Sequence, residues 1–229
     1  MSVETFGNGS NSWGFDSVTC KKMEYLKKFA PQNAEDYILE MAKDYQIVIF
    51  NEAHHIPLHR VFLKNMLGKL KLQGFNALGL EALTNCKNVP EGFQHLCDND
   101  SLLNQRGYPI NLQSAGPYTQ EPQMANLIRI AHQENYKIFS YEKFGPTREL
   151  DQAKYITEYL EENPNDKLII LCGYAHLFES FLPDYDKRMA VFLKELTGID
   201  PLTIDQCILT EGNPERNVEF YKWMNFDEA

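Results

Sequence analysis

The sequence lacks several signals that would place a protein in a class at once. Its five cysteines, Cys20, Cys86, Cys97, Cys172 and Cys207, form neither a CxxC pair nor a zinc-ligand spacing. No apolar run approaches the roughly 18 residues of a membrane-spanning helix, and the polar, glycine-rich start has no basic segment leading into an apolar one. These absences argue against a zinc site built on cysteines, a membrane protein and a secretory signal. They predict a cytoplasmic protein with reduced thiols.

Basic residues are also in short supply. The chain holds 22 Lys and Arg against 32 Asp and Glu, so its formal net charge is −10 at pH 7. A negative surface repels phosphate backbones and anionic lipids, which makes nucleic acid and membrane surfaces poor partners. We therefore expect a small molecule or a peptide as the substrate.

The sequence does contain enough apolar residues for one core. Hydrophobic residues make up 43% of the 229 residues, an ordinary share for a globular protein. The length favours one domain over two, and we find no internal repeat. We expect a disordered N-terminus over 1–15 and a single α/β domain over 16–229.

Short apolar runs alternate with longer amphipathic segments along this domain. The short runs predict buried strands over 46–50, 76–80, 137–141, 168–172 and 202–209. Helical periodicity predicts helices over 21–30, 34–44, 57–72, 120–134, 148–162 and 186–196. This alternation is typical of βαβ units. We therefore predict an α/β fold with a mostly parallel central sheet that helices cover on both faces.

One segment, residues 84–118, breaks this alternation. It is rich in Asn, Gly, Pro and Gln. Long segments of this kind in compact domains are often lids or binding elements. We interpret it as an insertion or lid after the second strand, and we predict that Tyr108 and Tyr118 contact the substrate.

Ionisable side chains follow four of the predicted strands, where those strands end. In an open parallel sheet the carboxyl ends of the strands share one edge, and ligands bind there. We therefore expect one site at this edge. Its predicted catalytic residues are Glu52, His54, His55, Glu81, Arg148 and His176. Its further predicted substrate contacts are Tyr141, Glu142 and Tyr174.

Carboxylates beside imidazoles serve two kinds of chemistry, and the sequence leaves both open. In the first, a histidine takes a proton from water while a carboxylate orients the ring. In the second, His54, His176 and Glu81 bind a divalent metal that acidifies the water. Arg148 opens its helix, where the helix dipole already places positive charge. We therefore expect Arg148 to face a carboxylate or a developing oxyanion.

Each of these residues also has an ordinary structural interpretation. Glu52 could cap the helix that follows it, His176 could be a structural histidine, and Arg148 could pair with Asp151 on its own helix. The placement of several such groups at the ends of strands favours a common site over separate structural roles.

These residues resemble the motifs of the erythromycin-esterase-like, ChaN-like and TIKI/TraB group of α/β proteins. In that group a Gly-x-x-His, often Gly-Glu-x-His, follows the first strand and a Glu follows the second. An Arg opens a later helix, and a second Gly-x-x-His follows a further strand. The matching residues here, over about 46–176, are Asn51-Glu52-Ala53-His54, Glu81, Arg148 and Gly173-Tyr174-Ala175-His176.

Two features depart from that pattern. Asn51 stands where the motif has glycine, which leaves open a partner-binding domain that has lost its chemistry. The adjacent histidines leave the register open, because His54 matches the Gly-x-x-His form and His55 matches the Glu-x-x-His form of the esterase branch.

The resemblance implies different activities in different branches: metal-independent hydrolysis of a macrolide lactone, metal-dependent proteolysis, or haem binding. The chain has no GxSxG elbow and no catalytic-cysteine context, so attack by activated water is favoured over a covalent intermediate. We predict a hydrolase of an ester or amide in which His54 or His55 is the base. A metal-dependent peptidase and a haem- or iron-binding protein are the alternatives, so the predicted cofactor is none, a divalent metal or haem.

Overall fold

The computed structural model describes residues 30, 32–84, 100–108, 117–179 and 187–207. Within these residues a five-stranded sheet has the order β3-β2-β4-β1-β5, and all its neighbouring strands run parallel. The strands are β1 (Ile47–Glu52), β2 (Phe75–Thr84), β3 (Lys137–Glu142), β4 (Lys167–Gly173) and β5 (Leu202–Ile204). The predicted α/β fold with a parallel central sheet is therefore confirmed.

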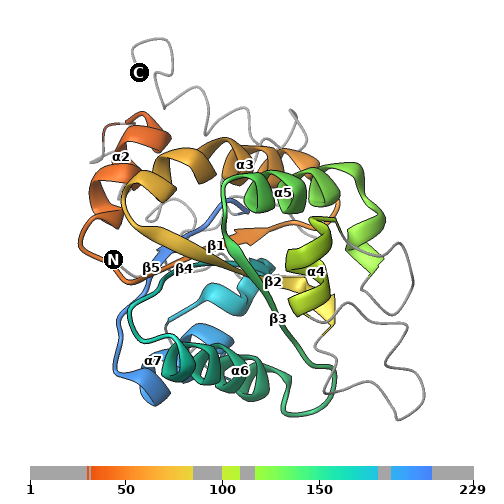
Figure 1. Ribbon diagram of the computed structural model, residues 1–229. Coiled ribbons are helices and arrows are strands. Elements are labelled where there is room, and N and C mark those ends of the chain that lie inside the picture. Colours follow the sequence, from red (N-terminus) through yellow and green to blue (C-terminus); the bar gives the residue numbers. More distant parts are fainter. Residues whose placement is uncertain (1–29, 31, 85–99, 109–116, 180–186, 208–229) are drawn as a thin grey trace, which may run out of the picture.

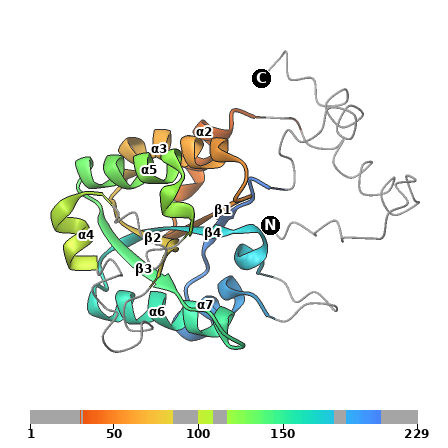
Figure 2. The ribbon, with the colours of Figure 1, turned by 90° about the vertical axis from the view of Figure 1, so that its right-hand side faces the viewer.

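Helices cover both faces of the sheet, with α2, α3 and α5 on one face and α6 and α7 on the other (Figures 1 and 2). α4 lies beside the edge strand β3, where the Asn104 side chain bonds the backbone of Ile138. The α-helices are α2 (Ala34–Ala42), α3 (Pro57–Leu72), α4 (Asp100–Arg106), α5 (Pro122–Gln133), α6 (Arg148–Glu162) and α7 (Met189–Thr197). Two short 3-10 helices are η4 (Pro117–Gln120) and η5 (Tyr174–Leu177).

The direction of the chain across the sheet decides which helices cover which face. From β1 through β2 to β3 it moves one way, and from β3 back to β4 and β5 it moves the other way. Because crossovers between parallel strands are right-handed, this reversal transfers the later helices to the opposite face. It also brings the carboxyl ends of β2, β4 and β1 side by side, at the kind of edge where open α/β sheets bind ligands.

Successive strand residues point to opposite faces and contribute to two apolar cores. Val48 and Phe50 of β1 pack with the core under α3 and α5, whereas Ile47 and Ile49 pack with the core under α6 and α7. All six residues of β1 are buried. Burial on both faces explains why the strands are apolar throughout instead of alternating.

The strands β1 and β2 extend further than the sequence predicted, and the difference matters for the site. β1 continues to Glu52 and β2 to Thr84, instead of ending at residues 50 and 80. The carboxylates of Glu52 and Glu81 therefore project from strand residues and not from the loops that follow. Helices 57–72 and 148–162 have the predicted bounds.

Several predictions fall wholly or partly outside the described residues. These are the disordered segment 1–15, the helix 21–30 apart from its last residue, residue 186 of the helix 186–196, residues 208 and 209 of the strand 202–209, and most of the insertion 84–118. Within the described residues the last strand is shorter than predicted, because β5 ends at Ile204 and residues 205–207 are not in a strand. The described parts of the insertion contain α4 and the start of η4. Among the described helices, none combines the length and apolar character needed to cross a membrane.

Candidate functional site

A buried ion pair lies at the carboxyl end of β1. Glu52 is the last residue of the strand, and its side chain is only 3% exposed. The fully buried Arg60 of α3 donates to it twice, from Nε to Oε2 over 2.6 Å and from Nη2 to Oε1 over 2.7 Å. Nη1 of Arg60 donates to Glu121, the N-cap residue of α5, over 2.8 Å. These contacts hold the Glu52 carboxylate in one orientation.

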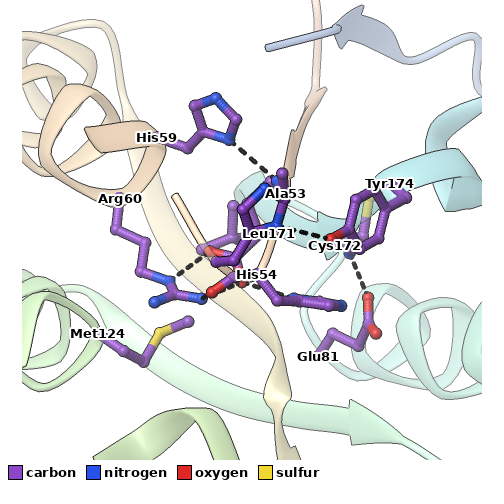
Figure 3. Close-up of polar contacts among 12 residues, drawn as sticks. Ala53, His54, His59, Arg60, Glu81, Met124, Leu171, Cys172 and Tyr174 are labelled. Atoms are coloured by element: carbon purple, nitrogen blue, oxygen red, sulfur yellow. Dashed lines mark hydrogen bonds and ion pairs between the residues drawn. The ribbon is translucent and has the colours of Figure 1, made fainter. Parts of the chain in front are cut away.

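The imidazole of His54 is hydrogen-bonded to this carboxylate. Figure 3 shows His54 with Arg60, Glu81 and Tyr174 around it. Its Nδ1 lies 2.9 Å from Oε1 of Glu52, so the neutral ring carries its proton on Nδ1 and leaves a lone pair on Nε2. The ring stacks on Tyr118 with 4.1 Å between centroids and meets Tyr174 edge-on at 5.0 Å. Nε2 makes no hydrogen bond to any described residue, so this nitrogen can receive a proton from a bound molecule.

Gly173 leaves the space that the His54 ring occupies. It is paired with Glu52 in the register of β4 with β1. A Cβ at position 173 would lie 2.5 Å from Cε1 and 2.6 Å from Nε2 of His54. Its backbone, with φ −84° and ψ 145°, is one that any residue adopts. Glycine is therefore required here by close approach and not by backbone conformation.

A second carboxylate, Glu81, lies on the other side of β4 from Glu52. It projects from β2 at a point where the pairing with β3 is irregular, between Leu80 and Thr84. Irregularities of this kind redirect side chains near sites. The carboxylate of Glu81 accepts a short hydrogen bond from the amide of Gly173, which ties it to the strand that also faces His54.

Arg148, the first residue of α6, faces two carboxylates as expected from its position. Its Nη2 lies 2.6 Å from Oε1 of Glu81, and its Nε and Nη2 donate to Glu142 over 2.9 and 2.5 Å. Glu142 also accepts from Gln152 of α6 over 3.1 Å. Nη1 of Arg148 makes no hydrogen bond to another described residue, and the side chain is 31% exposed. The guanidinium is thus anchored at one edge and open at the other.

His176 approaches Glu81 from η5, just after β4. Its Nδ1 lies 2.8 Å from Oε2 of Glu149, and its Nε2 lies 3.7 Å from Oε1 of Glu81. The longer distance exceeds a hydrogen bond. The structure therefore brings five of the six predicted catalytic residues to one edge of the sheet, in two groups joined by Gly173.

Charges in the site are held by their partners. Burial alone would raise the pKa of Glu52, but hydrogen bonds from His54 and Arg60 outweigh it and lower the pKa of that carboxyl. Burial likewise acts to raise the pKa of Glu149, and hydrogen bonding with His176 helps to lower it instead. Burial raises the pKa of the Tyr118 hydroxyl, and nearby carboxylates add to the shift. The carboxylates of Glu52 and Glu149 are thus held in their anionic form, and Tyr118 is held neutral.

His55 and Tyr141 make no described hydrogen bond to the carboxylates of this group. The exposed His55 ring places Nδ1 3.2 Å from the hydroxyl of Tyr174 and makes no described contact with a carboxylate. Tyr141 is fully buried and donates its hydroxyl to the carbonyl of Leu171 over 2.7 Å. As a core residue it offers no surface to a substrate, contrary to the prediction from its place at a strand end.

The other predicted substrate contacts divide between the two ends of the sheet. Tyr118 and Tyr174 flank His54, and Glu142 supports Arg148 from a buried position. Tyr108 is 50% exposed and contacts Arg106. It follows Gly107, which packs against the last turn of α5 before β3 begins. Tyr108 therefore lies nearer the amino ends of the strands than the predicted site.

Asn51, in the position of the motif glycine, acts as a structural link. Its Nδ2 donates to the carbonyl of Tyr174 over 2.8 Å and to Asp205 over 2.9 Å, and its Oδ1 accepts from the amide of Gln206 over 2.6 Å. Tyr174 has φ +35°, a left-handed conformation that is strained for a residue with a side chain. The link at Asn51 holds this strained turn in place between β4 and His176.

Sequence reasoning missed the residues that support the two histidines. Arg60 holds Glu52 and is itself bonded to Glu121, whereas Glu149 contacts His176 and is bonded to Arg188. One sequence signal was available for Arg60. It lies three residues before Leu63, so helical spacing places it on the same buried face of α3.

The predicted metal ligands His54, His176 and Glu81 are each engaged in contacts with other residues of the protein. Among the described residues, no three His, Cys, Asp or Glu side chains are arranged as a metal-binding group. Glu81 is engaged by Arg148 and by the amide of Gly173. In both His54 and His176, Nδ1 lies at bonding distance from a carboxylate, so only Nε2 remains for a further ligand.

Neither a protein-family model nor a curated protein matches this chain. A solved structure of bacterial protein toxins superimposes with a TM-score of 0.52 at 13% identity, over 83% of this chain and 40% of that chain. The type III effector HopBA1 gives 0.43 at 15% identity over 64% and 75%. RRSP, a MARTX toxin effector domain from Vibrio vulnificus CMCP6, gives 0.44 at 17% over 70% and 34%. The first of these shares its fold with this chain, which spans 40% of its length.

Replacing Arg60 with methionine removes the cation from a buried carboxylate. Breaking one side of a buried ion pair costs about 3–5 kcal/mol, so we expect the free energy of unfolding in urea to fall by about that amount. The matched control is Arg129→Met on the exposed face of α5, where we expect a change within about 0.5 kcal/mol. Equal effects of the two substitutions would contradict the buried pair.

Replacing Gly173 with alanine forces the His54 ring to move. The displaced atoms belong to the end of a partly exposed side chain, so we expect a small loss of stability but a broken contact between Nδ1 of His54 and Glu52 in a crystal structure of the variant. Gly68→Ala is the control, because its nearest neighbour would lie 3.8 Å away. An unmoved ring in Gly173→Ala would refute the steric argument.

The lowered pKa of Glu52 predicts how stability depends on pH. Its ionised form stabilises the fold fully above the ordinary value of 4.5, and this contribution is lost as the pH falls through the lowered value. We expect wild type to exceed Glu52→Gln in stability at about pH 7, and the difference to shrink towards about pH 3. Urea denaturation across this range measures it, and a constant difference would show that the Glu52 charge is not responsible.

Proposed function

We propose that this protein is a hydrolase of an ester or amide bond that uses water activated by His54. The observation that carries the proposal is the Glu52–His54 pair. The carboxylate is 3% exposed and fixed by Arg60, whereas the imidazole is 22% exposed and its Nε2 has no hydrogen-bond partner among the described residues. A buried carboxylate on Nδ1 of an accessible histidine orients the ring as a general base and stabilises the cation that it becomes.

In the proposed reaction, Nε2 of His54 takes a proton from water while the water oxygen attacks the carbonyl carbon. Nη1 of Arg148 and Nε2 of His176, when it carries a proton, stabilise the oxyanion that forms. The intermediate then collapses, the bond to the leaving group breaks, and the leaving oxygen or nitrogen takes up a proton. The products are a carboxylic acid and an alcohol or amine, so one water is added in total.

The aromatic side chains beside His54 indicate what the substrate resembles. Tyr118 and Tyr174 form two walls around the imidazole, and aromatic walls favour flat or apolar groups. We therefore propose a small molecule or peptide with such a group near the scissile carbonyl. The motif residues Glu52, His54, Glu81, Arg148 and His176 support the erythromycin-esterase-like type of hydrolase.

The fold shared with bacterial protein toxins supports a second candidate. In it the same residues perform the same chemistry, and the protein is a toxin that cleaves an amide bond in another protein. Folded protein substrates separate the candidates, because only the second requires cleavage of a bond in another protein.

The two cofactor-dependent alternatives make different demands on the site. A metal-dependent peptidase requires Glu81 to exchange Arg148 for a metal. A haem protein requires His54 or His55 as an axial ligand and an apolar slot for the macrocycle. The polar contacts of Glu81 and Arg148 beside His54 favour the metal-independent hydrolase over both.

The adjacent histidines provide a matched test. We expect His54→Gln to lower kcat/KM on a panel of chromogenic esters and amides by about 10²–10⁴-fold, the usual contribution of a general base. His55→Gln, at an exposed position one residue away, should retain the wild-type rate. Addition of EDTA should leave the rate unchanged.

Three outcomes would contradict the proposal. A loss of activity in His55→Gln with none in His54→Gln would move the base to the neighbouring residue. Inhibition by EDTA, reversed by a divalent metal, would establish the peptidase alternative. No hydrolysis together with a Soret band on haem titration, lost in His54→Gln, would establish haem binding.

A further inference from the structure

The site contains a second carboxylate–imidazole pair, on the far side of Glu81 from His54. Glu149, the second residue of α6, places Oε2 2.8 Å from Nδ1 of His176. The two side chains are 16% and 11% exposed. As in the first pair, the carboxylate meets Nδ1, and Nε2 turns towards Glu81 at 3.7 Å. Both imidazoles therefore present the same ring nitrogen to the site.

Glu149 is itself held in place. Nη1 of Arg188 donates to its Oε1 over 3.1 Å, and the amide of Met189 donates to its Oε2 over 2.8 Å. Met189 is the first residue of α7, so the positive end of that helix also faces the carboxylate. An arginine and a second element thus fix Glu149, as Arg60 of α3 fixes Glu52.

These contacts also allow a purely structural role for Glu149. An acidic residue in the first turn of α6 is favoured by the helix dipole, and the bond to Met189 caps α7. Neither function needs His176. The structural role therefore predicts that removal of the carboxylate changes stability alone, whereas a role in positioning predicts that the ring of His176 changes as well.

We propose that Glu149 is a positioning residue for the hydrolysis, which fixes the ring of His176 so that Nε2 faces the reacting group. The kinetic part of this inference rests on the proposed function, but the geometric part does not. With both nitrogens protonated, Nε2 of His176 donates a hydrogen bond to the oxyanion as it forms, while Nδ1 donates to Glu149. When the carbonyl re-forms and the bond to the leaving group breaks, the leaving oxygen or nitrogen takes the proton that His54 removed from water, and His176 keeps both of its protons.

The tautomer of His176 tests the geometry directly. In ¹⁵N-labelled protein at alkaline pH, where the ring is neutral, we expect two-bond ¹H–¹⁵N correlations to show the proton on Nδ1. Glu149→Gln keeps a carbonyl acceptor and should keep this tautomer. Glu149→Ala should move the proton to Nε2, and Glu161→Ala, at the exposed far end of α6, should change nothing.

Kinetics on the ester that the wild type cleaves best give the second readout. We expect Glu149→Ala to lower kcat on the order of 10- to 100-fold with KM unchanged, and Glu149→Gln to recover part of the loss. A wild-type ring with its proton on Nε2, or an Nδ1 proton that persists in Glu149→Ala, would overturn the inference.

The two readouts separate this inference from the proposed function. If no ester or amide is cleaved, the proposed function fails while the tautomer still decides whether Glu149 positions His176. If Glu149→Ala does not fold, the wild-type and Glu149→Gln spectra decide it, and an Nε2 tautomer in both counts against it.

Discussion

The arrangement of the site depends on one buried guanidinium. Arg60 has no exposed surface, so its charge must be met by protein groups, and it meets Glu52, Glu121 and the carbonyl of His54. A buried ion pair adds little stability over an apolar replacement, because desolvation of both charges offsets their attraction. Its value here lies in orientation: it joins the end of β1 to the starts of α3 and α5 and leaves Glu52 one position in which to hold His54.

Much of the fold could be predicted because it follows from local patterns. Apolar strands imply cover on both faces, and the helical periodicity after β1 and β3 gave the bounds of α3 and α6. The ends of β1 and β2 were less predictable, because Glu52 and Glu81 are charged and resemble loop residues. Their burial depends on the partners Arg60 and Arg148, which lie 8 and 67 residues away along the chain.

The location of a candidate-site residue could be predicted where the parallel sheet alone determines it. Residues at the ends of β1, β2 and β4 meet because those strands are neighbours, and His176 and His54 follow from this. The choice between His54 and His55 did not follow, because it depends on the turn after Glu52. Tyr141 was misjudged for a related reason: a strand-end residue faces either the site or the core, and β3 directs this one into the core.

Gly173 has a consequence for comparing related sequences. Its missing side chain is the space in which an imidazole from another strand sits, so the identity of one residue reports on the geometry of a distant one. A homologue with a larger residue there has either relocated the histidine or given up the pairing with its carboxylate. The residue at the end of β4 therefore distinguishes relatives that have kept this arrangement from those that have kept only the fold.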